Sequence, residues 1–274
     1  MEEWISPDDK IHKKVLVTGN RAFNKPFEES TFKLNISDCP KILDTFKNKT
    51  LTVGDSNGDL GRALDICVCT MHLNEKAQFT ISLDLEQITA IIELIELDFQ
   101  GFIYEWNAKK KIDIALKHKE KGTEFFNRKN QIEAAYRFTK ALKILLSIPV
   151  DVQYPPEITD GIKQTELKAL KGKLYNNLSS CYFREKVYKL AMPLCEKVLS
   201  IEPDNVKALY KIGVASEMEK DYDKAFSVLG KVMELEPRNK ACAQHLASVK
   251  QYLKKADSRV NEMMRKMIRG SISK

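Results

Sequence analysis

The stretch Leu199-Ser200-Ile201-Glu202-Pro203-Asp204-Asn205 has a counterpart further along the chain, Glu234-Leu235-Glu236-Pro237-Arg238-Asn239. The prolines of the two stretches lie 34 residues apart. From Ile114 onward the apolar residues follow the period of an α-helix, and helix breakers fall at regular places. A period of this length, built from pairs of helices, indicates a stack of helical repeats.

The 34-residue period is that of the tetratricopeptide repeat, and placing each proline at position 32 tests the match. Small residues then fall at positions 8 and 20, where the two helices of a repeat approach closely: Ser179 and Ala191, and Gly213 and Ala225. An earlier copy lacks the terminal proline and is anchored on Gly122, which places Ala134 at position 20. The pattern resembles three tetratricopeptide repeats, at 115–146, 172–205 and 206–239. The insertion at 147–168 contains Pro149, Pro155 and Pro156. We expect it to form extended helices around a proline-rich turn.

Residues 1–105 carry the alternating and β-branched runs of strands, punctuated by Gly and Asn. The expected strands are Lys14–Thr18, Thr31–Ile36, Lys49–Val53, Gln78–Leu83 and Ala90–Phe99, with a short helix over Asp59–Ile66. A charged junction, 106–114, leads into the repeats. The predicted fold class is therefore α+β, with a small antiparallel β domain followed by an all-α solenoid of three repeats.

The net charge of +7 is confined to the C-terminal end, because residues 240–274 contain nine basic and two acidic residues. A neutral body with a basic tail does not fit a nucleic-acid-binding fold. The stripe of Leu246, Val249, Leu253, Val260, Met264 and Met267 predicts a helix over 240–270 that caps the solenoid. This basic helix has two interpretations, a calmodulin target or a cap whose far end is solvated.

The concave groove of such a solenoid is lined by positions 2, 5, 6 and 9 of each first helix. Five residues at these positions are candidates for peptide binding: Lys119, Thr123, Asn177, Lys207 and Lys211. Lys207 and Lys211 are four residues apart and share a helix face. Three lysines and an amide that converge on one groove would bind a carboxylate-rich peptide through charge-assisted hydrogen bonds.

This set resembles the dicarboxylate clamp of tetratricopeptide co-chaperones, which grip the C-terminal Glu-Glu-Val-Asp of heat shock protein 90 or 70. The family pattern is Lys, Asn, Asn, Lys, Arg. Lys119, Asn177 and Lys207 match it directly. Thr123 replaces the first Asn, and Lys211 replaces the Arg, which keeps the charge but loses the bidentate fork. The resemblance implies weaker binding, with no preference between the two chaperones fixed by the clamp.

The junction of a β-rich domain with Lys119-Glu120-Lys121-Gly122-Thr123 resembles the FK506-binding immunophilins that carry tetratricopeptide repeats. Three N-terminal segments support the resemblance: Val15–Asn20 is similar to the first strand and its loop, Leu60–Met71 to the pocket helix, and Ile95–Phe99 to the closing strand. The resemblance implies an FK506-binding-like fold and a pocket that would isomerise prolyl bonds.

The pocket departs from the family pattern at most of its wall. Leu64 stands where the family has the Trp of the pocket floor, and Leu60-Gly61 replaces a Val-Ile pair. The loop that would carry a pocket Tyr is missing, and only Asp44 matches the pocket Asp. Prolyl isomerisation must lower a barrier of ~18–20 kcal/mol. We expect negligible isomerase activity and no FK506 binding.

No other chemistry is indicated. Cys67 and Cys69 lack a second pair at zinc spacing, so core thiols are expected. The acidic loop Gly54–Asp59 lacks the spaced Glu of a calcium loop. We therefore expect no catalytic residue, metal or cofactor. The six cysteines are dispersed, and the sequence has neither an apolar run of ~20 residues nor a signal segment. These features predict a cytoplasmic protein, and a nuclear location is also compatible with them.

Three functional hypotheses remain open from the sequence. The first is a non-enzymatic co-chaperone whose groove binds the chaperone tail while the N-terminal domain contacts a client. The second is an active prolyl isomerase. The third is a scaffold whose groove binds a different peptide.

Overall fold

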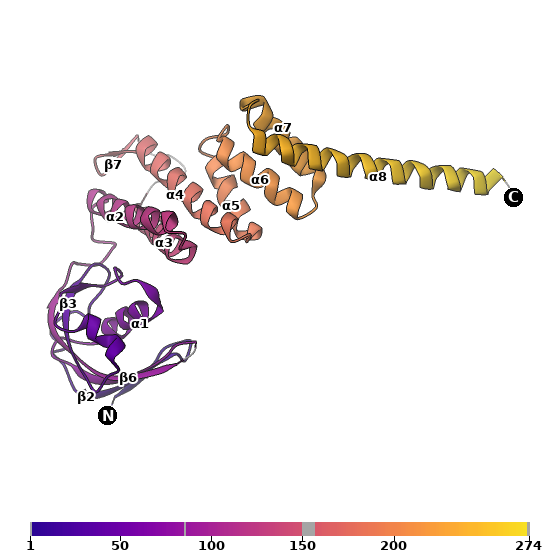
Figure 1. Ribbon diagram of the computed structural model, residues 1–274. Coiled ribbons are helices and arrows are strands. Elements are labelled where there is room, and N and C mark those ends of the chain that lie inside the picture. The colour runs from indigo at the N-terminus through magenta and orange to yellow at the C-terminus, as the bar shows by residue number, and fades with distance from the viewer. Residues whose placement is uncertain (1, 85, 150–156, 273–274) are drawn as a thin grey trace. The chain divides into compact units, whose positions relative to one another are not determined.

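The computed structural model describes residues 2–84, 86–149 and 157–272. The chain divides into two compact units, Met1–Trp106 and Asn107–Lys274. The first contains an antiparallel sheet and the second is helical, which confirms the predicted fold class (Figure 1). The first helix of the second unit begins at Ala108, inside the predicted junction at 106–114.

The sheet of the first unit has six strands in the order β1-β2-β5-β6-β3-β4. All the strand pairs are antiparallel. The strands are β1 (Glu3–Ile5), β2 (Ile11–Val17), β3 (Thr31–Ser37), β4 (Leu51–Thr52), β5 (Lys76–Ser82) and β6 (Gln87–Asp98). Strict alternation of buried and half-buried residues along β5 gives the sheet one apolar face. The sequence missed β1, and β4 is shorter than the predicted Lys49–Val53.

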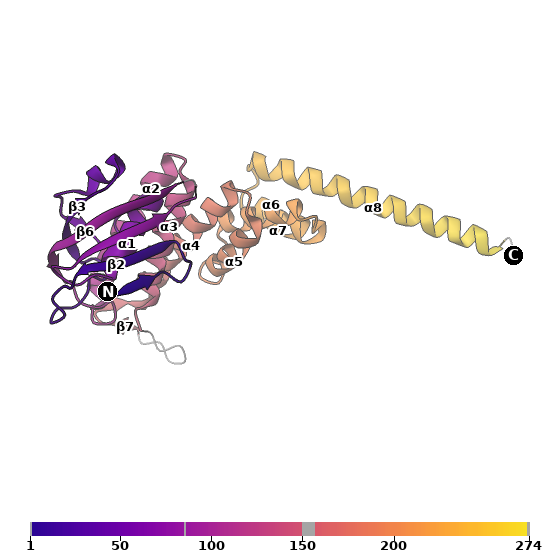
Figure 2. The same cartoon turned by 90° about the horizontal axis from the view of Figure 1, so that it is seen from below.

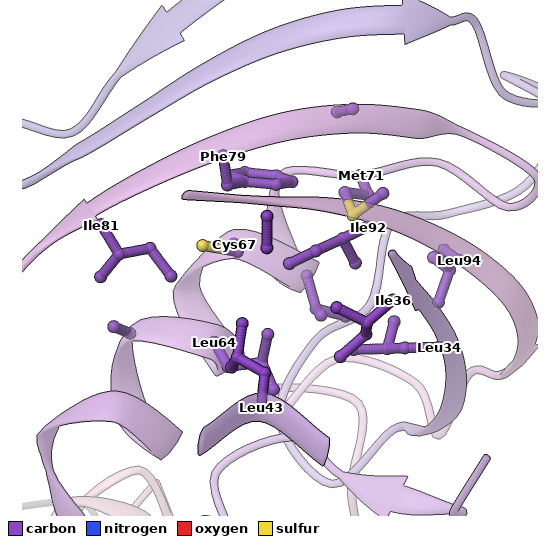
Figure 3. Close-up of a cluster of buried hydrophobic side chains, with 14 of the residues drawn as sticks. Leu34, Ile36, Leu43, Leu64, Cys67, Met71, Phe79, Ile81, Ile92 and Leu94 are labelled. Atoms are coloured by element: carbon purple, nitrogen blue, oxygen red, sulfur yellow. The ribbon is translucent and has the colours of Figure 1, made fainter. Parts of the chain in front are cut away.

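That apolar face is covered by α1 (Gly58–Cys69) and by the short 3-10 helix η1 (Lys41–Phe46). The sheet curls around α1 in Figure 1. Figure 3 shows Leu43 from η1 and Leu64 from α1 pointing into the same cluster as Phe79 and Ile92 of the sheet. All four side chains are fully buried, so helix and sheet share one dry core.

The second unit contains three helix pairs followed by a long helix. The pairs are α2 (Ala108–Asn127) with α3 (Gln131–Leu146), α4 (Gln164–Arg184) with α5 (Tyr188–Leu199), and α6 (Val206–Met218) with α7 (Tyr222–Leu235). Each pair is joined by a turn in which one lysine has positive φ, at Lys129, Lys186 and Lys220. The regular recurrence of this turn is the backbone counterpart of the sequence repeat.

The helices of a pair approach closely at position 8 of the repeat. A Cβ atom on Gly122 would lie 2.7 Å from Cε1 of Phe138, and one on Gly213 would lie 2.6 Å from Cγ of Leu229. Both partners are buried on the second helix of their pair. Glycine is therefore required at these two positions by packing and not by backbone conformation.

The insertion differs from its prediction in part. The helix before it is not extended, because α3 ends at Leu146, but α4 begins at Gln164, eight residues before the second repeat. A two-stranded hairpin that the sequence did not predict, β7 (Ile158–Thr159) with β8 (Ile162–Lys163), precedes α4. Pro155 and Pro156 lie outside the described residues.

The last helix, α8 (Lys240–Ile272), contacts α6 and α7, and the buried residues that the structure describes on it lie in its first half. Cys242 and Val249 are fully buried in this contact, and Tyr252 stacks on Tyr222 at 4.8 Å between ring centroids. From Lys254 to Arg265 every residue is exposed, and Figure 2 shows the helix running on beyond α7. Calmodulin binding by this half remains a prediction.

The close approach at position 8 predicts that Gly213→Ala destabilises the helical unit by ~1–3 kcal/mol, because the new methyl group collides with buried Leu229. Urea unfolding followed by far-UV circular dichroism measures this loss. Gly230→Ala on α7 is the matched control: nothing lies within 4 Å of the added carbon, so helix propensity should stabilise it by ~0.5–1 kcal/mol. Equal stability of the two variants would contradict the packing argument.

Candidate functional site

The predicted groove residues lie on α2, α4 and α6, the first helices of the three repeats. Thr123 and Asn177 line one small pocket of about 70 Å³, so the structure brings these two together across α2 and α4. The Thr123 hydroxyl donates to the carbonyl of Lys119, one turn earlier, at 2.9 Å. Lys119 is half-buried and Lys207 is exposed at the start of α6.

Lys211 behaves differently from Lys207, although both lie on the same face of α6. Its side chain is buried, and Nζ donates to the Asn176 carbonyl at 2.9 Å, to Asn176 Oδ1 at 2.8 Å and to Ser179 Oγ at 2.7 Å. Burial lowers the pKa of Lys211 to about 8, and the nearby charge of Lys207 acts in the same direction. The three donors of this ammonium group are thus all used within the protein.

Three residues that line the pocket were not among the predicted groove residues: Phe126, Phe138 and Ser180. Ser180 lies at position 9 of its repeat, a position already assigned to the groove, so the position rule could have found it. Phe126 lies near the end of α2, and the guanidinium of Arg184 stacks on its ring at 3.7 Å. This cation–π contact joins the ends of α2 and α4 beside the pocket. Nothing in the repeat pattern indicated that pair.

The residues compared with an isomerase pocket are divided between the core and the surface of the sheet domain. Leu64 is fully buried and Leu60 is half-buried against the same core. A Cβ atom on Gly61 would lie 2.9 Å from that of Ser56, so the loop before α1 closes on the helix there. Asp44 is exposed and pairs with Lys47 at 2.7 Å. The structure thus places Leu60 and Leu64 in or against the hydrophobic core and Asp44 at the surface.

One buried carboxylate holds this closed arrangement. Asp65 on α1 accepts hydrogen bonds from the Gly54 backbone N–H at 3.0 Å and from the Ser56 hydroxyl at 3.0 Å. Gly54 has a φ of 81°, a conformation that favours glycine. These two hydrogen bonds therefore hold the acidic loop Gly54–Asp59 against α1.

The six cysteines are free thiols, and Cys67, Cys181, Cys195 and Cys242 are buried. Burial raises the pKa of Cys181 to about 12, so its thiol stays protonated at neutral pH. These four buried cysteines are therefore core side chains. Among the described residues, no helix is long and apolar enough to cross a membrane.

Comparison with known proteins supports both halves of this description. Residues 4–99 match the family model described as "BDBT FKBP like N-terminal", and residues 172–205 match a tetratricopeptide-repeat model. The "FK506-binding protein-like" protein of Mus musculus is 28% identical over 96% of this chain and 72% of its own length.

Two solved structures are similar in fold. The C-terminal tetratricopeptide-containing domain of a putative FK506-binding protein of Plasmodium falciparum is 30% identical, with a TM-score of 0.51, and the match covers 57% of this chain and 99% of that one. A crystal structure of residues 1–211 of CG17282 has a TM-score of 0.56 at 21% identity, over 69% of this chain and 96% of that one.

The filled core predicts that Leu64→Trp, which introduces the family's aromatic residue, destabilises the first unit by ~1–3 kcal/mol through overpacking. Chemical unfolding followed by near-UV signals of the sheet domain measures the change. Ile66→Trp on the same helix is the control: its side chain is 48% exposed, and the change should stay within ~0.5 kcal/mol. A Leu64→Trp variant as stable as this control would show that room for the ring exists.

Proposed function

Since the chain belongs to the FK506-binding-protein-like proteins that carry tetratricopeptide repeats, we propose that it is a non-enzymatic co-chaperone. Its groove binds the acidic C-terminal peptide of heat shock protein 90 or 70. Its sheet domain contacts a client or another partner. The protein acts in the cytoplasm or nucleus, where those chaperones are found.

The observation that supports this proposal is that Lys119, Asn177 and Lys207 lie on three successive first helices, at repeat positions that the sequence assigns to the groove. Asn177 and Thr123 line the pocket between α2 and α4, and Lys207 is free to reach an incoming carboxylate. An amide, a hydroxyl and two ammonium groups offer only donors and neutral acceptors, which suits a peptide end that presents carboxylates.

The proposal that the sheet domain lacks isomerase activity rests on its packed core. A prolyl isomerase of this type needs an open apolar pocket that holds a twisted peptide bond. Leu43 and Leu64 instead point into a closed cluster, and Asp44 is paired with Lys47 at the surface (Figure 3). The domain is left with a surface for protein contacts and no aromatic pocket wall.

The clamp predicts micromolar binding of a peptide ending in Glu-Glu-Val-Asp, measured by isothermal titration calorimetry with the full chain. Lys207→Glu should weaken binding at least about tenfold, because it removes a charge-assisted hydrogen bond and adds repulsion. Lys189→Glu makes the same charge change at an exposed position of α5, the second helix of its repeat, and should leave the affinity unchanged.

The outcomes of this titration separate the hypotheses. Binding that survives Lys207→Glu would favour a scaffold that recognises another feature of the peptide. An equal loss of affinity in Lys207→Glu and Lys189→Glu would indicate a general effect of net charge and would contradict the clamp. A peptide with Gln and Asn in place of Glu and Asp tests the carboxylates directly, and it should not bind.

A separate prediction concerns catalysis by the sheet domain. The full chain should not accelerate cis–trans isomerisation of a proline-containing peptide beyond the uncatalysed rate, because Leu64 replaces the aromatic floor that would hold a twisted peptide bond, and the barrier of ~18–20 kcal/mol is then not lowered. An active FK506-binding isomerase assayed in parallel provides the positive control. Acceleration that FK506 inhibits would sink this part of the proposal.

A further inference from the structure

The clamp resemblance assigns Lys211 the same task as Lys207, but the structure gives these residues different surroundings. Lys207 is exposed, whereas Lys211 is only 7% exposed. Three hydrogen bonds of 2.7–2.9 Å connect the Lys211 ammonium group to Asn176 and Ser179 on α4. These bonds cross from the first helix of the third repeat to that of the second.

The acceptor Ser179 distinguishes the second repeat from the other two. Ser179 lies at position 8 of its repeat, where the other two repeats have Gly122 and Gly213. Its hydroxyl donates to the Asn176 carbonyl at 2.8 Å and accepts from Lys211. A glycine there would offer no side-chain acceptor. The one repeat that departs from glycine thus supplies an acceptor for the lysine of the next repeat.

The position of these bonds relates them to the groove. Asn176 directly precedes Asn177, and Lys211 lies one helical turn after Lys207. The bonds therefore fix the turn of α4 that carries Asn177 relative to the turn of α6 that carries Lys207. A shift between the two helices would change the spacing of the two groups that are proposed to receive carboxylates.

We infer that Lys211 is a positioning residue of the peptide groove, which holds α4 and α6 in register through Asn176 and Ser179 and does not itself bind the peptide. This inference rests on the proposed peptide binding. It leaves Lys119, Thr123, Asn177 and Lys207 as the groups that contact the ligand. The recognised ligand therefore has fewer obligatory ion pairs than the five-residue pattern implies.

The test compares Lys211→Met with Lys207→Met in titrations of the Glu-Glu-Val-Asp peptide at low and high salt. Loss of a cation that pairs with the peptide reduces the salt dependence of the dissociation constant, because one screened ion pair is removed. Lys207→Met should show this reduction. Lys211→Met should weaken binding about three- to tenfold at both salt concentrations, with the salt dependence of the wild-type protein.

A milder variant covers the case in which Lys211→Met fails to fold. Ser179→Ala removes one acceptor, changes no charge and keeps a small residue at position 8. It should weaken binding about two- to threefold with unchanged salt dependence. A double-mutant cycle adds a readout that general destabilisation would not move: Lys211→Met should be non-additive with Asn177→Ala and additive with Lys119→Met.

Two results would overturn the inference. One is a loss of salt dependence in Lys211→Met as large as that in Lys207→Met, which would make Lys211 a direct ligand. The other is unchanged affinity in both Lys211→Met and Ser179→Ala. A wild-type protein that does not bind the peptide at all would instead retire the proposed function, so the two failures are distinguishable.

The burial of the Lys211 ammonium group has a separate readout in the pH dependence of stability. The titratable groups that act on Lys211 are Cys181 on α4, Cys195 on α5 and Lys207 on α6. Because the folded-state pKa is about 8 and the unfolded value is 10.5, the unfolded chain binds more protons between these values. Lys211 taken alone therefore makes stability rise with pH across this interval. The buried thiols act in the opposite direction, because burial raises the pKa of Cys181 and of Cys195. The stability of the wild-type protein relative to that of Lys211→Met should therefore rise with pH across this interval.

Discussion

The helical half of this protein depends on the close approach of two helices at one position of each repeat. At Gly122 and Gly213 no methyl group fits, because Phe138 and Leu229 occupy the space from the second helix. This contact sets the distance between the helices of a pair, and the distance sets how the first helices line up along the groove. The groove is thus a consequence of packing between the helices of each pair, and Phe138 takes part in both, because it also lines the pocket beside Thr123 and Asn177.

The dependence of the repeats on local packing explains why they were predictable from the sequence, whereas the details of the groove were not. The small residues recur with a fixed period because each obeys a local steric constraint, and three copies make the pattern visible. Lys211 illustrates the limit. Its position on the helix face followed from the spacing, but the direction of its flexible side chain depends on acceptors in Asn176 and Ser179, more than thirty residues earlier. No local rule contains that information.

The same limit applies to the sheet domain and the insertion. Strands β5 and β6 were found because burial alternates along them, whereas β1 has only three residues and lies at the edge of the sheet. The hairpin before α4 rests on two residue pairs between a proline-rich stretch and a helix, too few to make a periodic signal. The closing of the pocket region could be anticipated from Leu64, but the role of Asp65 in fixing the adjoining loop required coordinates.

The two halves place their candidate functional groups differently with respect to packing. In the sheet domain, Leu64 stands where the family has an aromatic residue and lies in the closed core, so a change there acts on stability as well as on any pocket. In the repeats, Lys207 is exposed, whereas Lys211 bonds to Asn176 and Ser179 of the preceding repeat. A substitution at Lys207 therefore changes the charge offered to a ligand and leaves the packing intact. A substitution at Lys211 also changes the contact between two repeats.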